Sequence, residues 1–138
     1  MTSRLKRTSF DIEVDLIDRI VQVRVVGSMT KENTKILTSM ALHLLHLYGL
    51  RNYLYDVTYA DKHYSPLDTR AVWAHMAKSH KRMLAKLRIA RVDVHGKPSE
   101  EAVAEEIARS RGVSAFRAFN SKHRAHAWLA SLLDEFEK

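Results

Sequence analysis

Residues 86–129 constrain the fold most, because this segment alternates twice between an extended and a helical pattern. An apolar run at 87–94 predicts a buried strand, and Pro98 is typical of the first position of a helix. A second apolar run at 113–119 is followed by another helix that begins near Ser121. Strand, helix, strand and helix at this spacing predict parallel strands joined by helical crossovers.

The rest of the chain extends this pattern toward the N-terminus. Alternating residues predict a half-buried strand at 9–17 and a more buried one at 20–27, joined by a tight turn and therefore antiparallel. The elements expected after this hairpin are a helix from Ser28 or Thr30 to about Tyr48, a strand at 52–59, and a helix from Pro66 to about Leu84. The fold class is α/β, with a mixed sheet of about five strands and helices packed against it.

Length and composition limit the class of protein. The 138 residues suit one domain over 1–138, and the basic segment 1–8 is expected to be disordered. The chain has no cysteine, which excludes disulfides and thiol catalysis and fits a reducing compartment. The sequence shows no signal-peptide pattern and no apolar run near the ~20 residues of a membrane span. We therefore expect a cytoplasmic protein without a transmembrane segment.

The first long helix is apolar on more than one side, which indicates a second neighbour, either the rest of the domain or another copy of the chain. Ile36, Met40 and Leu47 belong to the stripe expected to face the sheet. Leu42 and Leu45 fall off that stripe, so they are the apolar residues expected at the interface of a homodimer.

The net charge of +7 favours an anionic partner, although a basic balance also merely keeps a protein in solution. Arg88 and Arg91 are expected on opposite faces of their strand, because side chains alternate. Nucleic acid is disfavoured, since no helix-turn-helix, RRM or zinc-finger pattern occurs and no aromatic residues interleave with the basic ones. The densest basic run comprises Lys78, Lys81, Arg82, Lys86, Arg88 and Arg91.

Histidines and carboxylates give no metal or catalytic signature. His43 and His46 stand three residues apart on one helix, but a zinc site needs three or four converging ligands. Asp56 and Asp61 flank the end of a strand, where open parallel sheets bind ligands, yet no nucleophile or base is paired with them. The sequence predicts a non-enzymatic protein with no catalytic residue, no metal ligand and no cofactor.

The order of elements resembles the SpoIIAA-like (STAS) fold of anti-sigma-factor antagonists and of the cytoplasmic domains of sulfate transporters. Residues 54–58 (Leu-Tyr-Asp-Val-Thr), followed by a capped helix, are similar to the central strand and switch loop of that family. Residues 87–92 are similar to the next strand, and 116–120 with 127–129 to the ending of the SpoIIAA-like subgroup. The resemblance covers nearly the whole chain and implies a SpoIIAA-like protein without an assigned role.

The switch loop departs from the family pattern. Antagonists of the sporulation type carry Asp-Ser-Ser-Gly, phosphorylated on serine, where this chain has Tyr64, Ser65, Pro66 and Leu67, so only Ser65 matches. Two interpretations of Ser65 stay open. It caps the following helix through its hydroxyl, or it is a phosphosite at the positive end of the helix dipole.

The favoured function is a protein-interaction or regulatory domain that docks an acidic partner protein. The expected docking residues are Tyr59, Asp61, His63, Tyr64, Arg70, His75, Lys78, Lys81 and Arg82. The alternative is a carrier of a small apolar or amphiphilic ligand, which the resemblance also implies, because this fold is similar to lipid-binding domains of the Sec14 type. Residues at helical spacing, such as Trp73 and Met76, are expected to fill the core more often than to line a cavity.

Overall fold

The predicted order of strands and helices is confirmed in a computed structural model of the chain, which describes residues 9–63, 65–113 and 115–137. For His63 and residues 132–137 it describes the backbone alone. The disorder expected for residues 1–8 concerns a segment outside the described residues. The elements of the described chain are β1 (Ser9–Asp15), β2 (Ile20–Thr30), α1 (Lys31–Tyr48), β3 (Asn52–His63), α2 (Pro66–Lys86), β4 (Arg88–Val92), α3 (Pro98–Ser110), β5 (Ala115–Phe119) and α4 (Lys122–Glu137).

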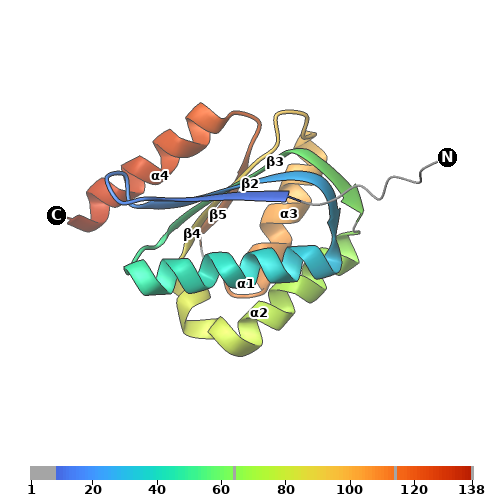
Figure 1. The fold of residues 1–138 in the computed structure, drawn as a ribbon, viewed down its shortest axis with the longest axis horizontal. Helices are drawn as coiled ribbons and strands as arrows, with labels where there is room; N and C mark the ends of the chain where they lie inside the picture. Colours follow the sequence, from blue (N-terminus) through green and yellow to red (C-terminus); the bar gives the residue numbers. More distant parts are fainter. Residues whose placement is uncertain (1–8, 64, 114, 138) are drawn as a thin grey trace.

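The described strands form one sheet in the order β1-β2-β3-β4-β5 (Figure 1). β1 is antiparallel to β2 and the other neighbours are parallel, so the predicted mixed sheet and its N-terminal hairpin are confirmed. The strands advance in one direction across the sheet, and right-handed crossovers then place their helices on a single face. Accordingly α1, α2 and α3 cover one face, while α4 folds back over β3, β4 and β5 on the other.

Both faces of the sheet are apolar where helices cover them. The larger core lies under α1, α2 and α3 and includes Leu37, Met76, Ile89 and Ile107. Successive strand residues face opposite ways, so Ile89 belongs to this core and Ala90 to the smaller one, and every residue of β4 is buried. The smaller core, under α4, contains Ile20, Leu54, Ala90, Val92, Ala125 and Leu129.

Local sequence signals determine where the helices begin and end. Of the two caps predicted for α1, Thr30 is the one used, and its side chain accepts a hydrogen bond from the Asn33 N–H at 3.2 Å. Gly49 ends α1 in the left-handed conformation (φ 66°), which is favourable for a residue without a Cβ. Gly112, also at positive φ (103°), turns the chain from α3 toward β5.

The first strand is shorter than predicted. The sequence pattern places Leu16 and Ile17 in it, but both lie exposed in the turn before β2. The Asp15 carboxylate accepts hydrogen bonds from the backbone N–H groups of Ile17 (3.0 Å) and Asp18 (2.9 Å). This local bonding gives the backbone an alternative to strand pairing and ends β1 two residues early.

The predicted buried side of α1 is confirmed only in part, because Leu37 and Ala41 of the predicted stripe are buried while three other members are exposed. Leu42 and Leu45 are 1% and 0% exposed, whereas Ile36, Met40 and Leu47 are 56%, 45% and 63% exposed. The helix is therefore turned about its axis relative to the prediction. Leu42 and Leu45 offer no exposed surface to a second copy, and the predicted homodimer stays a prediction without these two residues.

The reason for this error is the neighbour of α1. α2 packs beside α1, and the Ser39 hydroxyl donates to the Met76 Sδ atom at 3.8 Å across that contact. The second neighbour indicated by the apolar surplus is thus another part of the same chain. Two partners, the sheet and α2, determine the orientation of α1, and periodicity alone reports neither of them.

Candidate functional site

A cavity of about 480 Å³ lies between the sheet and the helices α1, α2 and α3. It opens at the edge where the parallel strands end, which is the usual position of ligand sites in open α/β sheets. Its apolar lining comes from Met29, Leu37, Tyr53, Tyr55, Val72, Trp73, Val103, Ala104, Ile107 and Phe116. Its polar lining includes Lys31, Thr34, Thr38, Lys62, Ser65, Asp68, Thr69, Arg91, Ser99 and Glu100.

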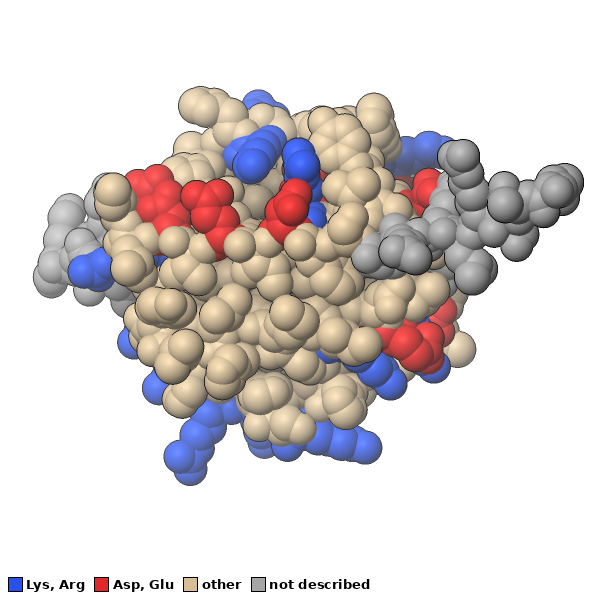
Figure 2. Space-filling model, in the orientation of Figure 1, with Lys and Arg blue, Asp and Glu red and all other residues tan. Residues whose placement is uncertain are grey.

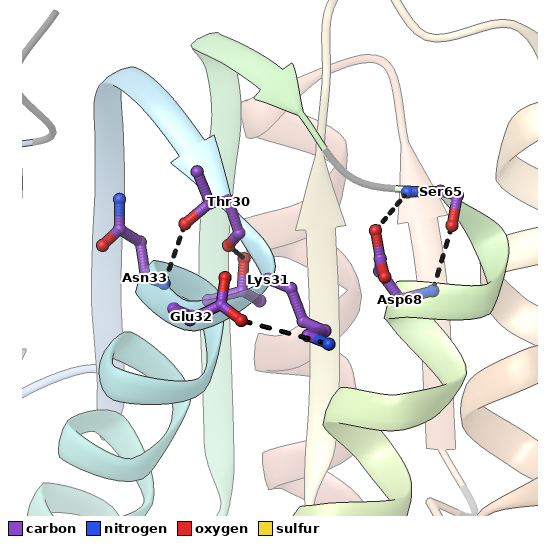
Figure 3. Close-up of polar contacts among 7 residues, drawn as sticks. Thr30, Lys31, Glu32, Asn33, Ser65 and Asp68 are labelled. Carbon is purple, nitrogen blue, oxygen red and sulfur yellow. Dashed lines mark hydrogen bonds and ion pairs between the residues drawn. The ribbon is translucent and has the colours of Figure 1, made fainter. Parts of the chain in front are cut away.

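The first turns of three helices surround the mouth of this cavity. Lys31 and Thr34 come from the start of α1, Ser65 and Pro66 from the start of α2, and Ser99 from the start of α3. Figure 3 shows the beginnings of α1 and α2 at the same end of the sheet. Helix N-termini carry partial positive charge, so three of them at one opening favour a negative group there.

An aromatic wall forms one side of the cavity. The rings of Tyr53 and Tyr55 stack with their centroids 5.3 Å apart, and Phe116 lies 6.3 Å from Tyr55. Trp73 of α2 meets Phe116 edge to face at 6.1 Å. Burial, with a smaller contribution from Tyr55, raises the pKa of the Tyr53 hydroxyl well above its ordinary value of 10.0, so this hydroxyl stays protonated.

Charged side chains lie toward the outer end of the lining. Lys62 of β3 forms an ion pair with Asp93, whose side chain is 2% exposed. Burial alone would raise the pKa of the Asp93 carboxyl. Hydrogen bonds from Lys62 and from the His95 N–H (3.0 Å), with the positive charges of Lys62 and Arg91, outweigh burial and hold that pKa below its ordinary value of 3.8.

Arg91 is a residue whose role the sequence pattern did not reveal. It lies on β4, beside Tyr55 of β3 in the parallel register, and is 9% exposed. Arg88 lies on the opposite face of β4, as predicted from alternation. The available signal in the sequence was an arginine within an apolar run. Such a residue is costly to bury unless it has partners.

Ser65 caps α2. Its hydroxyl oxygen accepts a hydrogen bond from the Asp68 N–H at 3.2 Å, and the Asp68 carboxylate accepts one from the Ser65 N–H at 3.0 Å (Figure 3). This capping box satisfies two backbone donors at the start of the helix. The phosphosite interpretation stays a prediction, and a phosphate on Ser65 would lie beside the Asp68 carboxylate, which would repel it.

The predicted docking residues do not share one surface. Tyr59 is exposed on the face of the sheet that α4 only partly covers, where the Arg24 guanidinium lies 5.8 Å from the centre of its ring. Asp61 follows two residues later and faces the same way, because Ala60 and Lys62 face the helices. Tyr64 and the side chain of His63 lie outside the described residues.

The basic members of that set do lie together, on the exposed side of α2. Arg70, His75, Lys78, Lys81 and Arg82 are all exposed, as predicted. Figure 2 shows positive side chains along the lower edge of the molecule, where α2 lies, and acidic ones along β1 above. The acidic side chains of β1 belong to Asp11, Glu13 and Asp15.

The remaining candidate sites form no reactive cluster. His43 and His46 are exposed on α1, and the Asp56 carboxylate accepts a hydrogen bond from the Thr58 N–H at 2.9 Å. Among the described residues, no three His, Cys, Asp or Glu side chains lie close enough to hold a metal ion. Within the same part of the chain, no helix combines the length and apolar character needed to cross a membrane.

Comparison with known proteins identifies the fold. One solved structure similar to this chain is that of an uncharacterised protein of the DUF3478 family with a SpoIIAA-like fold, from Shewanella loihica PV-4. It is 24% identical, covers 94% of this chain and 98% of its own, and superposes with a TM-score of 0.60. No protein-family model and no curated protein matches the chain. The SpoIIAA-like fold implied by the sequence is thus confirmed.

Proposed function

We propose that this protein binds a small amphiphilic molecule in the cavity between the sheet and α1, α2 and α3. One observation carries the proposal. A cavity of about 480 Å³ combines an aromatic wall with a few polar groups at its mouth. Small-molecule sites typically enclose roughly 300–1,000 Å³ and are mostly apolar, with a small number of placed polar groups.

The chemistry of the lining supports binding in preference to catalysis. Tyr53 holds its proton, Ser65 is engaged in the cap of α2, and the Lys62 amine is engaged with Asp93. A catalytic centre needs a nucleophile or base paired with a group that activates it. The arrangement therefore favours a carrier or sensor of its ligand.

Tryptophan fluorescence tests this proposal directly. The chain has two tryptophans, and Trp73 lines the cavity while Trp128 packs against Phe119 on the other face of the sheet. In the Trp128→Phe variant, decanol or decanoate added below its critical micelle concentration should change the Trp73 emission saturably. In the Trp73→Phe variant the emission of Trp128 should not respond.

A matched pair of substitutions locates the binding. Ala104→Phe places a ring into the cavity from α3 and should abolish the response, whereas Ala102→Phe adds the same ring on the exposed side of α3 and should leave it unchanged. Thr34→Phe fills the cavity from α1 and repeats the test if Ala104→Phe unfolds. Saturable binding that survives both filling variants in folded protein, or no binding by any amphiphile, would rule out this function.

A second candidate function is docking of an acidic protein partner on α2, supported by the exposed basic row. Charge reversal of Lys78, Lys81 and Arg82 to Glu should release acidic proteins that the unmodified chain captures. Long-range attraction of this kind weakens with salt, so added salt should release the same proteins. Reversal of Arg117, Lys122 and Arg124, which are exposed away from α2, changes the net charge equally and should release none of them. Equal losses from both triple variants would contradict docking at α2.

A further inference from the structure

We propose that the cavity selects amphiphiles with an oxyanion head group, a carboxylate or a phosphate, and holds that group at its mouth beside Arg91. This inference rests on the proposed binding function and specifies its ligand class. It follows from the way polar and apolar side chains are distributed along the cavity. The apolar part of the ligand would then lie along the aromatic wall.

The cavity has a polar outer end and an apolar inner end. Lys31, Ser65 and Ser99 belong to the first turns or cap of helices that begin at the outer edge of the sheet. Ile107 lies three residues from the end of α3, and Tyr53 lies two residues before Tyr55 on β3, so both line the inner end. An amphiphile that matches this gradient enters tail first.

Arg91 is the group best placed to bind the head. It lines the cavity, is 9% exposed, and lies beside Tyr55 at the outer side of the aromatic wall. A guanidinium carries five N–H donors in a planar fork that matches the two oxygens of a carboxylate or phosphate. Arg91 also acts electrostatically on Asp93, which lies one residue beyond the end of β4.

Side chains of both signs lie around the mouth, and the Lys31 amine lies 4.0 Å from the Glu32 carboxylate (Figure 3). The Asp68 carboxylate accepts a hydrogen bond from the Ser65 N–H, and the Asp93 carboxylate is paired with the Lys62 amine. The N-termini of α1, α2 and α3 add partial positive charge at the opening, and this charge favours a negative group there. The N-cap of α3 is Lys97, a side chain that cannot accept a hydrogen bond from the first N–H groups of the helix. The charged residues described in the lining are Lys31, Lys62 and Arg91 against Asp68 and Glu100.

Amphiphiles that share one chain and differ only in the head group test the inference. Decanoate and decyl phosphate are titrated against decanol in the Trp128→Phe protein, with Trp73 emission as the signal. Charge-assisted hydrogen bonds contribute enough to predict that at least one anion binds about tenfold or more tightly than decanol. The two anions distinguish a carboxylate site from a phosphate site.

Three substitutions assign the preference to the mouth. Arg91→Met keeps an unbranched side chain without the guanidinium, and it should weaken the binding of the anion far more than the binding of decanol, which removes most of the advantage of the anion. Lys31→Met, at the rim, should reduce the same advantage about twofold to fivefold, as expected for a partly exposed charge. Lys78→Met removes an exposed lysine that does not line the cavity and should leave the preference intact.

The outcomes separate this inference from the proposed function. Equal affinity for decanol and both anions would overturn the head-group inference while the cavity remained a binding site. An anion preference that survives Arg91→Met and Lys31→Met would also overturn it. Absence of binding by all three probes would instead refute the proposed function. If circular dichroism shows that Arg91→Met does not fold, the anion preference of Lys31→Met is compared with that of Lys78→Met. An equal preference in these two variants would then overturn the inference.

Discussion

At the residue scale, Asp93 shows how one buried charge can connect two strands of the sheet. It follows β4 directly, pairs with Lys62 of β3, and accepts a hydrogen bond from the His95 N–H. These contacts connect the ends of two neighbouring strands. A buried carboxylate is tolerated only when such partners compensate for the lost hydration.

The lowered pKa of Asp93 predicts a stability that depends on pH. Because the folded state binds this proton less tightly than the unfolded chain, the stabilisation is present above the ordinary value of 3.8 and is lost as pH falls through the folded value. The free energy of unfolding should therefore drop on acidification more steeply for wild type than for Asp93→Asn. Urea denaturation at a series of acid pH values measures both slopes.

A double-mutant cycle checks that Lys62 is a cause of this effect. Lys62→Met removes the hydrogen bond and the charge that lower the pKa of Asp93, so its acid transition should move to higher pH. In the Lys62→Met background, Asp93→Asn should change stability less than it does in wild type. Identical slopes for wild type and Asp93→Asn would show that Asp93 contributes nothing to acid sensitivity.

At the scale of the element, α2 is well specified at its start. Ser65, Pro66 and Asp68 supply the cap, the first helical position and the reciprocal bond of the capping box. These are local signals, and the sequence therefore predicted this helix start correctly. Further along, His80 departs from helical geometry (φ −134°, ψ 29°), a feature that the sequence did not indicate.

The cap of α2 gives a second prediction. Ser65→Ala should lower the free energy of unfolding by about 1 kcal/mol, because the Asp68 N–H loses its acceptor. Ser65→Asn should cost only a small part of this amount, since asparagine caps about as well as serine. Chemical denaturation of the three proteins measures the difference, and equal losses for both variants would show that the cap itself is not the stabilising contact.

At the scale of the whole molecule, the sequence predicted what depends on neighbouring residues and missed what depends on packing. The alternation in β1, the apolar runs of β4 and β5 and the caps at Thr30 and Ser65 predicted the order of elements, and from it the fold class. The orientation of α1 and the cavity depend on how three helices lie relative to one another. Trp73 illustrates the limit, because it is buried as predicted for a core residue and also lines the cavity.

The same limit explains the divided docking set. In a regular strand Tyr59 and Asp61 would face the helices, as Tyr53 and Tyr55 do, but the register of β3 shifts between the partners Arg24 and Val26 of β2. Before the shift Tyr53 and Tyr55 face the helices, and after it Ala60 and Lys62 do. A β-bulge of this kind moves every later side chain of the strand to the other face of the sheet. No residue in this part of the sequence indicates the position of the bulge.

The outermost strand has a consequence for behaviour at high concentration. β1 pairs with β2 on one side only, so within the described sheet its other side presents unpaired backbone groups. Sheet margins of this kind can recruit a like strand from another molecule and start fibrous aggregates. Asp11, Glu13 and Asp15 place negative charge along this margin. Two molecules brought margin to margin therefore repel each other while these carboxylates are ionised, and strong acid would remove that protection.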